Sequence, residues 1–344
     1  MSSTHRFLLK IAAALVAVAA LLPLQAVAQT PIQFRVQNLF PAGDPLYENF
    51  AEYARNVKAM SNGRIEIVNL SSGSVVGPAG TLDAVSAGVI DGHFSYAGYW
   101  SGREAGLAAM ADLSGAYDDE FSLISYYYGH GGLELLREMY AKYNMFTVGI
   151  STGGIESLPS RKRIETVADL RGMKVRLPPG IAALIFQGLG ATPINLPLSE
   201  AFGALEKGVV DAADAGALYY NDKIGLHEHA KFLLTPSPHS TVVLDFTVNA
   251  DKWKRLPPDL QQIMLTAMPQ SAMKSATQRI QADAKVKAAA QSRGLTLTEW
   301  SPAERTKFRA EAQKVWSEWA KRSEFSRRAV ETQVEWLKLT GALK

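Results

Sequence analysis

The chain lacks cysteine altogether: none occurs among its 344 residues. This absence excludes disulfides, thiol nucleophiles, zinc–thiolate centres and cysteine-ligated iron–sulfur clusters. The fold must therefore rest on a buried apolar core, and a chain of this length can bury one.

The chain also has no marked excess of charge of one sign. Lys and Arg number 36 against 33 for Asp and Glu, which gives a formal charge of +3. Removal of Arg6 and Lys10, which lie in an N-terminal segment described below, lowers it to +1. No basic cluster with interleaved aromatic residues is present, so we expect no nucleic-acid partner.

Sequence motifs of common hydrolases are missing too. The chain contains no Gly-x-Ser-x-Gly elbow, no His-Glu-x-x-His helix and no glycine-rich phosphate loop. A periplasmic enzyme acting on a carboxylic acid remains an alternative, but no nucleophile–base pair supports it, and we expect a protein that is not an enzyme.

Long hydrophobic runs are absent after the first 28 residues, and the one at the start has the features of a secretion signal. His5, Arg6 and Lys10 precede the apolar run Ile11–Leu22, and Ala26-Val-Ala28 supplies the small residues that signal peptidase requires. The run is too short for a stable membrane span. We therefore expect a signal peptide over 1–28, cleaved after Ala28, and a periplasmic protein; an uncleaved anchor is the alternative.

From residue 32 onward, the hydrophobic pattern alternates between strand-like and helix-like periods. Residues 33–39 and 64–70 alternate as strands do, whereas residues 46–60 have helical spacing. The last third of the chain is helical. Its long stretch 260–293 contains Pro269, which we expect to kink the helix or split off its first turns.

A short segment occurs twice, 120 residues apart. Ala84-Val-Ser-Ala-Gly-Val-Ile-Asp91 is echoed by Ala204-Leu-Glu-Lys-Gly-Val-Val-Asp211. Each has the form of a helix end, a glycine C-cap and an apolar pair leading to an aspartate. The repeat predicts two α/β lobes, and a small ligand would bind in the cleft between them.

The stretch Asp169-Leu-Arg-Gly-Met-Lys-Val-Arg-Leu-Pro-Pro-Gly180 places one arginine where α/β proteins bind ligands. Residues 173–177 alternate as a short strand, and Pro178 ends it before an apolar helix. Arg176 therefore lies at the carboxyl end of a strand. A guanidinium there can hold a carboxylate through two parallel hydrogen bonds; a solvated arginine on an edge strand is the alternative.

These segments together resemble the solute-binding receptors of TRAP (tripartite ATP-independent periplasmic) transporters, the DctP-type family. The resemblance covers nearly all of the chain after residue 28, and its second-lobe motifs are the more specific. They are Asp169–Arg176, Gly188-Leu-Gly-Ala-Thr-Pro193 and Ala204–Asp211. Gly131-Gly-Leu-Glu-Leu135 and Tyr220–His227 are similar to the branch of receptors for keto acids, hydroxy acids and other organic acids.

The resemblance implies a two-lobed periplasmic binding protein fold of the α/β class with a long connecting helix. We expect lobe I over 29–150, with later segments crossing back, and lobe II over 151–250. A helical C-terminal region, 251–344, would pack across both lobes. The implied partners are the TRAP membrane subunits, and the chain would act as a monomer or homodimer. An ABC-type periplasmic binding protein would share the architecture and is the runner-up.

In the family, the arginine that matches Arg176 holds the substrate carboxylate. The chain departs from the family at Glu156, where one branch has a second substrate arginine and the keto-acid branch a metal-associated glutamine. It departs again at Asp214-Ala215, which stands where the keto-acid branch has a Glu-Trp pair after the residue that matches Asp211. A second substrate carboxylate would thus meet an acid, which favours a keto-, hydroxy- or aromatic monocarboxylate over a plain dicarboxylate.

Glu156 and Asp214 are also the candidate metal ligands. If both face the cleft, they would repel a bound acid unless a cation such as Ca²⁺ or Na⁺ intervened, or unless one accepted hydrogen bonds from the ligand. His227 and His229 diverge on a helix and lack a third ligand, so we expect no metal there.

Four more residues are candidates for the cleft. Tyr96, Tyr99 and Trp100 follow a strand, and would either wall the cleft or pack in the core. His239 follows Ser237-Pro238, where the family often has a histidine near the cleft.

Overall fold

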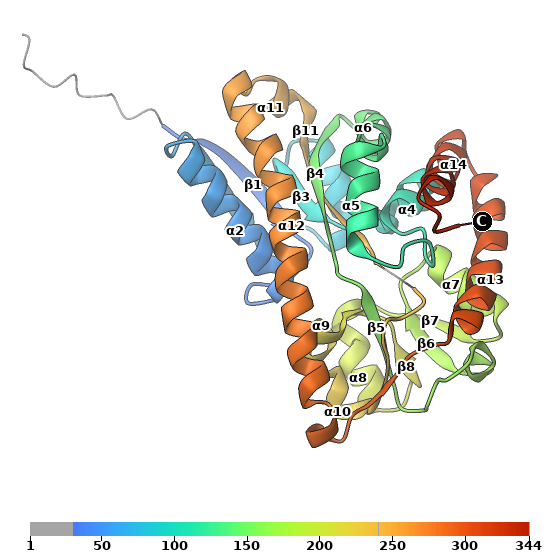
Figure 1. Cartoon of the computed structure of the whole chain (residues 1–344). Helices are drawn as coiled ribbons and strands as arrows, with labels where there is room; N and C mark the ends of the chain where they lie inside the picture. The colour runs from blue at the N-terminus through green and yellow to red at the C-terminus, as the bar shows by residue number, and fades with distance from the viewer. Residues whose placement is uncertain (1–29, 240, 344) are drawn as a thin grey trace, which may run out of the picture.

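The computed structural model describes residues 30–239 and 241–343, so the expected signal peptide lies outside the described part. Two mixed β-sheets lie one above the other in Figure 1. The upper sheet has the strand order β2-β1-β3-β11-β4. Its strands are β1 (Ile32–Asn38), β2 (Ile65–Leu70), β3 (Gly92–Ser95), β4 (Met145–Thr152) and β11 (Val243–Asn249).

The lower sheet has the order β12-β10-β5-β8-β6-β7, with β9 paired to β5 off this path. Its strands are β5 (Glu156–Ser160), β6 (Lys174–Leu177), β7 (Thr192–Asn195), β8 (Ala212–Ala213), β9 (Gly216–Ala217), β10 (Phe232–Leu234) and β12 (Thr296–Thr298). In both sheets the early strands pair in parallel, as strand–helix–strand units require: β1 with β2 and β3, and β6 with β7 and β8.

The helices fall into three groups. We call the upper sheet with α2–α6 the first lobe: α2 (Pro45–Met60), α3 (Thr81–Ser86), α4 (Ala105–Ala111), α5 (Glu120–Gly129) and α6 (Gly132–Ala141). The lower sheet with α7–α10 is the second lobe: α7 (Ile181–Gly188), α8 (Ala201–Glu206), α9 (Leu218–Lys223) and α10 (Leu226–His229). The rest are α11 (Ala250–Lys254), α12 (Pro258–Ala289), α13 (Pro302–Ala320) and α14 (Glu324–Leu339).

Short 3₁₀ turns complete the chain: η1 (Pro78–Gly80), η2 (Ala97–Trp100), η3 (Val167–Leu170), η4 (Leu198–Glu200) and η5 (Gln291–Arg293). The family resemblance predicted this two-lobed α/β architecture with a helical C-terminal region. The two sheets and their helices confirm the fold class.

The long helix α12 runs along both lobes (Figure 1), packing against β4 and α2 of the first and α9 of the second. Pro269 lies inside it, so the expectation that this proline splits off the first turns is wrong. A proline costs an interior helix about 3 kcal/mol or more. Buried Met264, Met268 and Ala272 flank it, and their packing offsets that cost.

One predicted boundary is wrong. Strand β11 was assigned to the second lobe by the range 151–250, but it pairs with β3 and β4 in the sheet of the first lobe. The chain therefore returns to the first lobe between β10 and β11. This crossing segment contains His239, and a second crossing lies between β4 and β5 at residues 153–155.

The repeated segment forms the same hydrogen bonds in both lobes. In the first, the Arg35 amide donates to Asp91 Oδ2 at 2.8 Å and the Asp91 amide donates to the Arg35 carbonyl at 2.8 Å. In the second, the Lys174 amide donates to Asp211 Oδ2 at 2.9 Å and the Asp211 amide to the Lys174 carbonyl at 2.7 Å. Each aspartate thus fastens a helix–strand joint to the neighbouring strand, which supports the predicted duplication.

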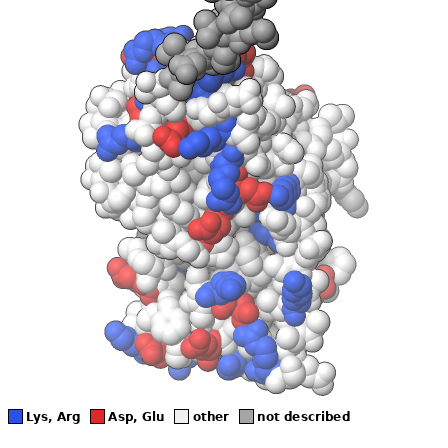
Figure 2. Space-filling view, turned by 90° about the vertical axis from the view of Figure 1, so that its left-hand side faces the viewer, with Lys and Arg blue, Asp and Glu red and all other residues white. Residues whose placement is uncertain are grey.

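Charged side chains of both signs lie interspersed on the face shown in Figure 2. Within the described residues, no helix is both long and apolar enough to cross a bilayer.

The glycine in each repeat adopts the left-handed conformation, with φ of +73° at Gly88 and +69° at Gly208. Gly88→Ala should lower the free energy of unfolding by about 1–2 kcal/mol, the cost of a side chain in this region. Space is not the cause, because an added Cβ at Gly88 would meet nothing within 4 Å.

The matched control is Gly77→Ala. Gly77 is equally open but has a φ of −60°, so alanine there should leave stability unchanged or raise it by about 0.4–1 kcal/mol. Urea unfolding of both variants measures the difference. Equal losses in the two would contradict the conformational explanation.

Candidate functional site

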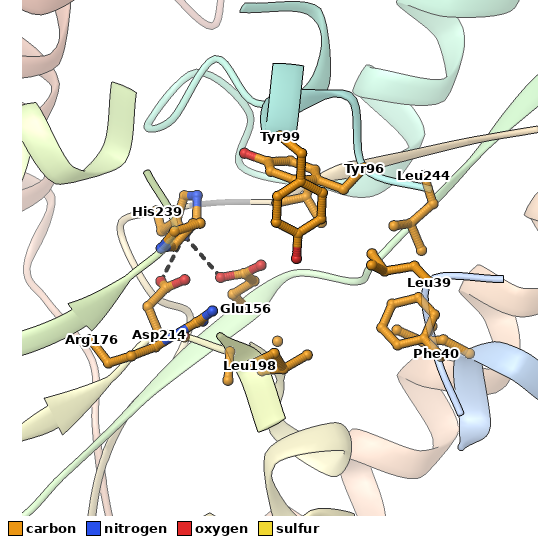
Figure 3. A pocket seen from close by; sticks show the side chains of 16 residues that line it. Leu39, Phe40, Tyr96, Tyr99, Glu156, Arg176, Leu198, Asp214, His239 and Leu244 are labelled. Atoms are coloured by element: carbon orange, nitrogen blue, oxygen red, sulfur yellow. Dashed lines mark hydrogen bonds and ion pairs between the residues drawn. The ribbon is translucent and has the colours of Figure 1, made fainter. Parts of the chain in front are cut away.

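A cavity of about 70 Å³ lies between the lobes (Figure 3). The lining comes from both lobes and both crossing segments: Leu39, Phe40, Leu46, Tyr96, Tyr99, Gly153, Glu156, Arg176, Pro178, Leu198, Asp214, Ala215, Gly216, His239, Val242 and Leu244.

Arg176 lies on β6 and is only 6% exposed. Its Nε donates to the Leu196 carbonyl at 3.0 Å, and Nη1 donates to the Asp214 carbonyl. Both carbonyls belong to loops that follow neighbouring strands, so they fix the plane of the guanidinium. Because Nε is engaged, a carboxylate would be held by the two terminal amino groups rather than by the Nε side.

The equivalent position in the first lobe is Gln37, since Arg35 corresponds to Lys174. Its side chain donates to the Val76 carbonyl at 2.7 Å and accepts from the Val75 amide at 3.0 Å. The first lobe thus uses this strand position to hold its own loop. In the second lobe the same position presents a cation to the cavity.

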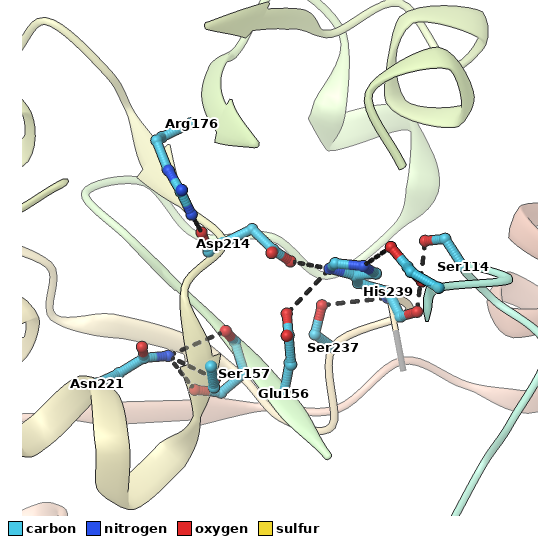
Figure 4. Close-up of polar contacts among 10 residues, drawn as sticks. Ser114, Glu156, Ser157, Arg176, Asp214, Asn221, Ser237 and His239 are labelled. Carbon is cyan, nitrogen blue, oxygen red and sulfur yellow. Dashed lines mark hydrogen bonds and ion pairs between the residues drawn. The ribbon is translucent and has the colours of Figure 1, made fainter. Parts of the chain in front are cut away.

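His239 is fully buried at the centre of a carboxyl cluster (Figure 4). Its Nδ1 lies 2.6 Å from Asp214 Oδ2 and 2.9 Å from Glu156 Oε2, while Nε2 lies 2.6 Å from Asp112 Oδ2. Asp112 ends α4 of the first lobe, whereas Glu156 and Asp214 belong to the second. The imidazole therefore joins the two lobes.

The cluster's charges are set by burial and by mutual contact. Burial alone disfavours the imidazolium, but the charges of Asp112, Asp214 and Glu156 raise the pKa of His239 well above its usual value. Burial and the nearby Asp214 raise the pKa of Glu156 to about 8. Asp214 is buried too, yet His239 holds its pKa below the usual value. At neutral pH the cluster thus contains an imidazolium, an Asp214 carboxylate and a protonated Glu156.

One hydrogen on Nδ1 cannot serve two acceptors well. It is directed at Asp214, and Glu156 Oε2 is left buried without a hydrogen-bond partner, as is Asp112 Oδ1. Unpaired buried oxygens are costly, and protonation of Glu156 lowers that cost. A protonated Glu156 also removes a charge that would repel an anionic ligand.

Two of the three aromatic candidates line the cavity, and the third does not. Tyr96 and Tyr99 line the cavity, and the Tyr99 hydroxyl points into it in Figure 3. Trp100 does not line it: its Nε1 donates to the Ala79 carbonyl at 2.8 Å and its ring stacks on His93 at 5.0 Å. Of the two alternatives for Trp100, packing in the core therefore holds and walling the cleft does not, because the 3₁₀ turn η2 directs successive side chains to different sides.

Among the described residues, the metal-ligand geometry occurs at one place. Glu156, Asp214 and His239 offer ligand atoms within 4.8 Å of one another. A metal held there would need the unprotonated Nδ1, with Nε2–H donating to Asp112 as metal-ligating histidines commonly do. The donor set of two carboxylates and one imidazole fits a cation. His227 does not take part in this group, and its Nδ1 lies 3.0 Å from Asp222 Oδ1.

Sequence reasoning missed Asp112 and the apolar wall. Asp112 ends an alanine-rich helix and carries no motif. Leu39, Phe40 and Leu198 look like ordinary core residues, so the pattern gives no sign that they face a ligand cavity.

A family model for bacterial extracellular solute-binding proteins, family 7 (DctP), matches residues 36–322. The chain belongs to this family. Its membership confirms the resemblance drawn from Arg176 and the repeated motifs, and it places the chain among solute-binding proteins rather than enzymes.

Relatives and solved structures agree with the family. A monocarboxylate 2-oxoacid-binding periplasmic protein of Nostoc is 32% identical over 241 residues, covering 69% of this chain and 65% of the relative. The match thus spans just under two thirds of that relative's length. A TRAP solute-binding protein of Rhodobacter sphaeroides, solved in an apo open state, is 35% identical, with 91% of this chain and 99% of that chain covered and a TM-score of 0.78.

A second solved TRAP solute-binding protein, from Pseudoalteromonas atlantica, holds sodium and pyruvate. It is 25% identical to this chain, covering 91% of it and 95% of the solved chain, with a TM-score of 0.82.

The raised pKa of Glu156 predicts how stability depends on pH. Between its ordinary value of 4.5 and about 8, the folded state keeps a proton that the unfolded state has released. The free energy of unfolding should therefore fall as pH rises through this window, by at most about 1.4 kcal/mol per pH unit for this group. His239 acts in the same direction above its unfolded pKa, because its folded pKa is raised.

Glu156→Gln should make this pH dependence shallower between about pH 5 and pH 8. The exposed Glu134→Gln serves as control and should leave the slope unchanged. Urea unfolding in chelator-containing buffer at several pH values measures both. A slope in Glu156→Gln as steep as in the wild type would show that this carboxyl does not titrate as described.

Proposed function

We propose that the protein is an extracytoplasmic receptor of a TRAP transporter that binds a small monocarboxylic acid in the interlobe cavity. It would deliver the ligand to the membrane subunits from the periplasm, after cleavage of a signal peptide at Ala28. The observation that carries the proposal is the fixed guanidinium of Arg176, buried at the carboxyl end of β6 and lining the cavity.

The lining favours one carboxylate over two. Arg176 is the single Lys or Arg among the described residues that line the cavity. A carboxylate held by its terminal amino groups would lie near Asp214, whose charge His239 already balances. A second carboxylate would find no further Lys or Arg among these lining residues and would meet Glu156, because the His239 imidazolium is already paired with Asp112 and Asp214. A plain dicarboxylate is therefore disfavoured.

Neutral hydrogen-bond donors in the cavity favour a ligand that has an oxygen on the carbon next to its carboxylate. Glu156 is protonated below about pH 8, and the Tyr99 hydroxyl stays neutral because burial raises its pKa. Either could donate to a 2-oxo or 2-hydroxy oxygen of the ligand. The name of the Nostoc relative, a receptor for monocarboxylate 2-oxoacids, makes 2-oxo acids the first class to test.

Binding would close the lobes. The cavity lining comes from both lobes, so a ligand gains its full set of contacts only when they approach each other. Differential contact of this kind shifts the open–closed equilibrium.

A cation-assisted form is the second candidate. Solved family members hold sodium with pyruvate, calcium with pyruvate, and calcium with picolinate. In this chain Glu156, Asp214 and His239 would hold the Ca²⁺ or Na⁺. We favour the metal-free form, because the His239 imidazolium already lies between the two carboxyls.

Arg176→Ala should weaken binding of a 2-oxo acid such as pyruvate by about two to three and a half decades. The estimate follows from the roughly 3–5 kcal/mol lost when one partner of a buried ion pair is removed. Arg176→Lys should also fail, because one ammonium cannot replace donors that hold Leu196, Asp214 and the ligand together. Calorimetry measures affinity, and circular dichroism checks that both variants fold.

Arg171→Ala is the control for these variants. It removes an exposed arginine of the same lobe that lies outside the cavity, and it should bind as the wild type does. If Arg176→Ala binds within about threefold of wild type, far from the expected loss, the proposed site is wrong.

Removal of metal should change the affinity little. We expect wild-type Kd for pyruvate to stay within about threefold after a chelator is added and sodium is replaced by a large organic cation. A loss of binding restored by Ca²⁺ or Na⁺ alone would instead establish the cation-assisted form.

A further inference from the structure

The polar and apolar side chains of the cavity lie at opposite ends. Arg176, Asp214, Glu156 and His239 gather on one side in Figure 3, while Leu39 and its apolar neighbours face them from the other. A ligand that lies across the cavity therefore meets charge at one end and hydrocarbon at the other. This asymmetry carries information about the part of the ligand that is not the carboxylate.

The apolar end borders a second, outer hollow. Leu39, Phe40, Tyr99 and Leu198 line both spaces, so the two spaces meet at these side chains. The outer hollow has a volume of about 270 Å³. Its remaining lining is largely apolar: Pro41, Pro78, Pro197, Phe202 and Ile224, with Asp44, Ser72, Ser199 and Tyr220.

The one charged residue of the outer hollow is already paired. Asp44 Oδ1 accepts from the Leu46 amide at 2.8 Å, and Oδ2 accepts from the Tyr220 hydroxyl at 3.0 Å. This second bond joins α2's N-cap in the first lobe to α9 in the second. Within the described residues that line the hollow, no Lys, Arg or His is present to receive a second anionic group.

We infer that the outer hollow holds a hydrocarbon tail, so that the preferred ligand is a monocarboxylate with an extended apolar substituent rather than a three-carbon acid. The tail passes between Leu39 and Leu198 and lies against Phe202 and Ile224. This inference rests on the proposed function, because the carboxylate must first be fixed by Arg176. The inference adds the direction in which the rest of the ligand lies and the apolar chemistry of that end.

The expected gain follows from burial of apolar surface. Each methylene that leaves water contributes about a fourfold increase in affinity. The gain should continue along an unbranched series until the hollow is filled. It should then level off, because further methylenes would remain in water.

The test is the affinity of the full mature chain for the unbranched 2-oxo acids from pyruvate to 2-oxoheptanoate, measured by calorimetry. In the wild type, Kd should fall about threefold to fourfold per added methylene over several members. Ile224→Asn places an amide in the hollow, away from the carboxylate end, and should reduce this dependence on tail length. Val209→Asn, an exposed position of the same lobe outside both spaces, should retain it.

Ser199→Trp provides a second variant if Ile224→Asn does not fold. Ser199 is exposed at the wall of the hollow, so an indole there should occupy it at little cost to the core. The affinity for longer acids should then drop toward that for pyruvate.

The outcomes separate the two claims. If acids bind through Arg176 but the wild-type affinity is flat or falls with tail length, the inference is overturned and the proposed function stands. The inference also fails if Ser199→Trp keeps the wild-type series. If neither the 2-oxo acids nor the matching 2-hydroxy acids bind, the proposed function fails, and the inference that rests on it fails too.

Discussion

The contact on which the site depends is the one between His239 and three carboxyl groups from two lobes. Nε2 holds Asp112 of the first lobe and Nδ1 holds Asp214 of the second, each at 2.6 Å. The backbone of His239 is also fixed, since its carbonyl accepts from the Gly115 amide at 2.9 Å. A buried imidazolium shared in this way balances acids that would otherwise repel any anionic ligand. His239 also lies on a segment that crosses between the lobes. The same residue therefore balances the charges near the ligand and contacts both lobes.

The remainder of the cavity is arranged around that balance. Arg176 is held by the carbonyls of Leu196 and Asp214, which leaves Nη2 and the second hydrogen of Nη1 for a carboxylate. Because such a site offers one cation and a long apolar wall, its selectivity would come from the tail of the ligand as much as from its head group. The family supplies the common architecture. Within it, Arg176, Glu156 and Asp214 form the polar end of this cavity, and Leu39, Phe40 and Leu198 form its apolar end.

Much of the fold followed from local pattern. The repeat ending in Asp91 and Asp211 predicted two related lobes, and the strand–proline pattern placed Arg176 at a strand end; both agree with the structure. The pairing of Asp112 with His239 was not predictable, because 127 residues separate them and no motif marks the aspartate. Whether Trp100 lines the cavity or packs in the core could not be predicted for a different reason. In a 3₁₀ turn, neighbouring residues direct their side chains to different sides, and the sequence does not show which side faces the cavity. The assignment of β11 to the second lobe was wrong because an alternating pattern identifies a strand but not the sheet to which it belongs.

The most direct test of the account is a crystal structure of the chain with a bound 2-oxo acid of medium length. The account predicts the carboxylate at hydrogen-bond distance, about 3 Å, from the terminal amino groups of Arg176. It predicts the tail between Leu39 and Leu198, with His239 still between Asp112 and Asp214. A ligand bound with its carboxylate away from Arg176, or with its tail turned toward Glu156 and His239, would contradict it.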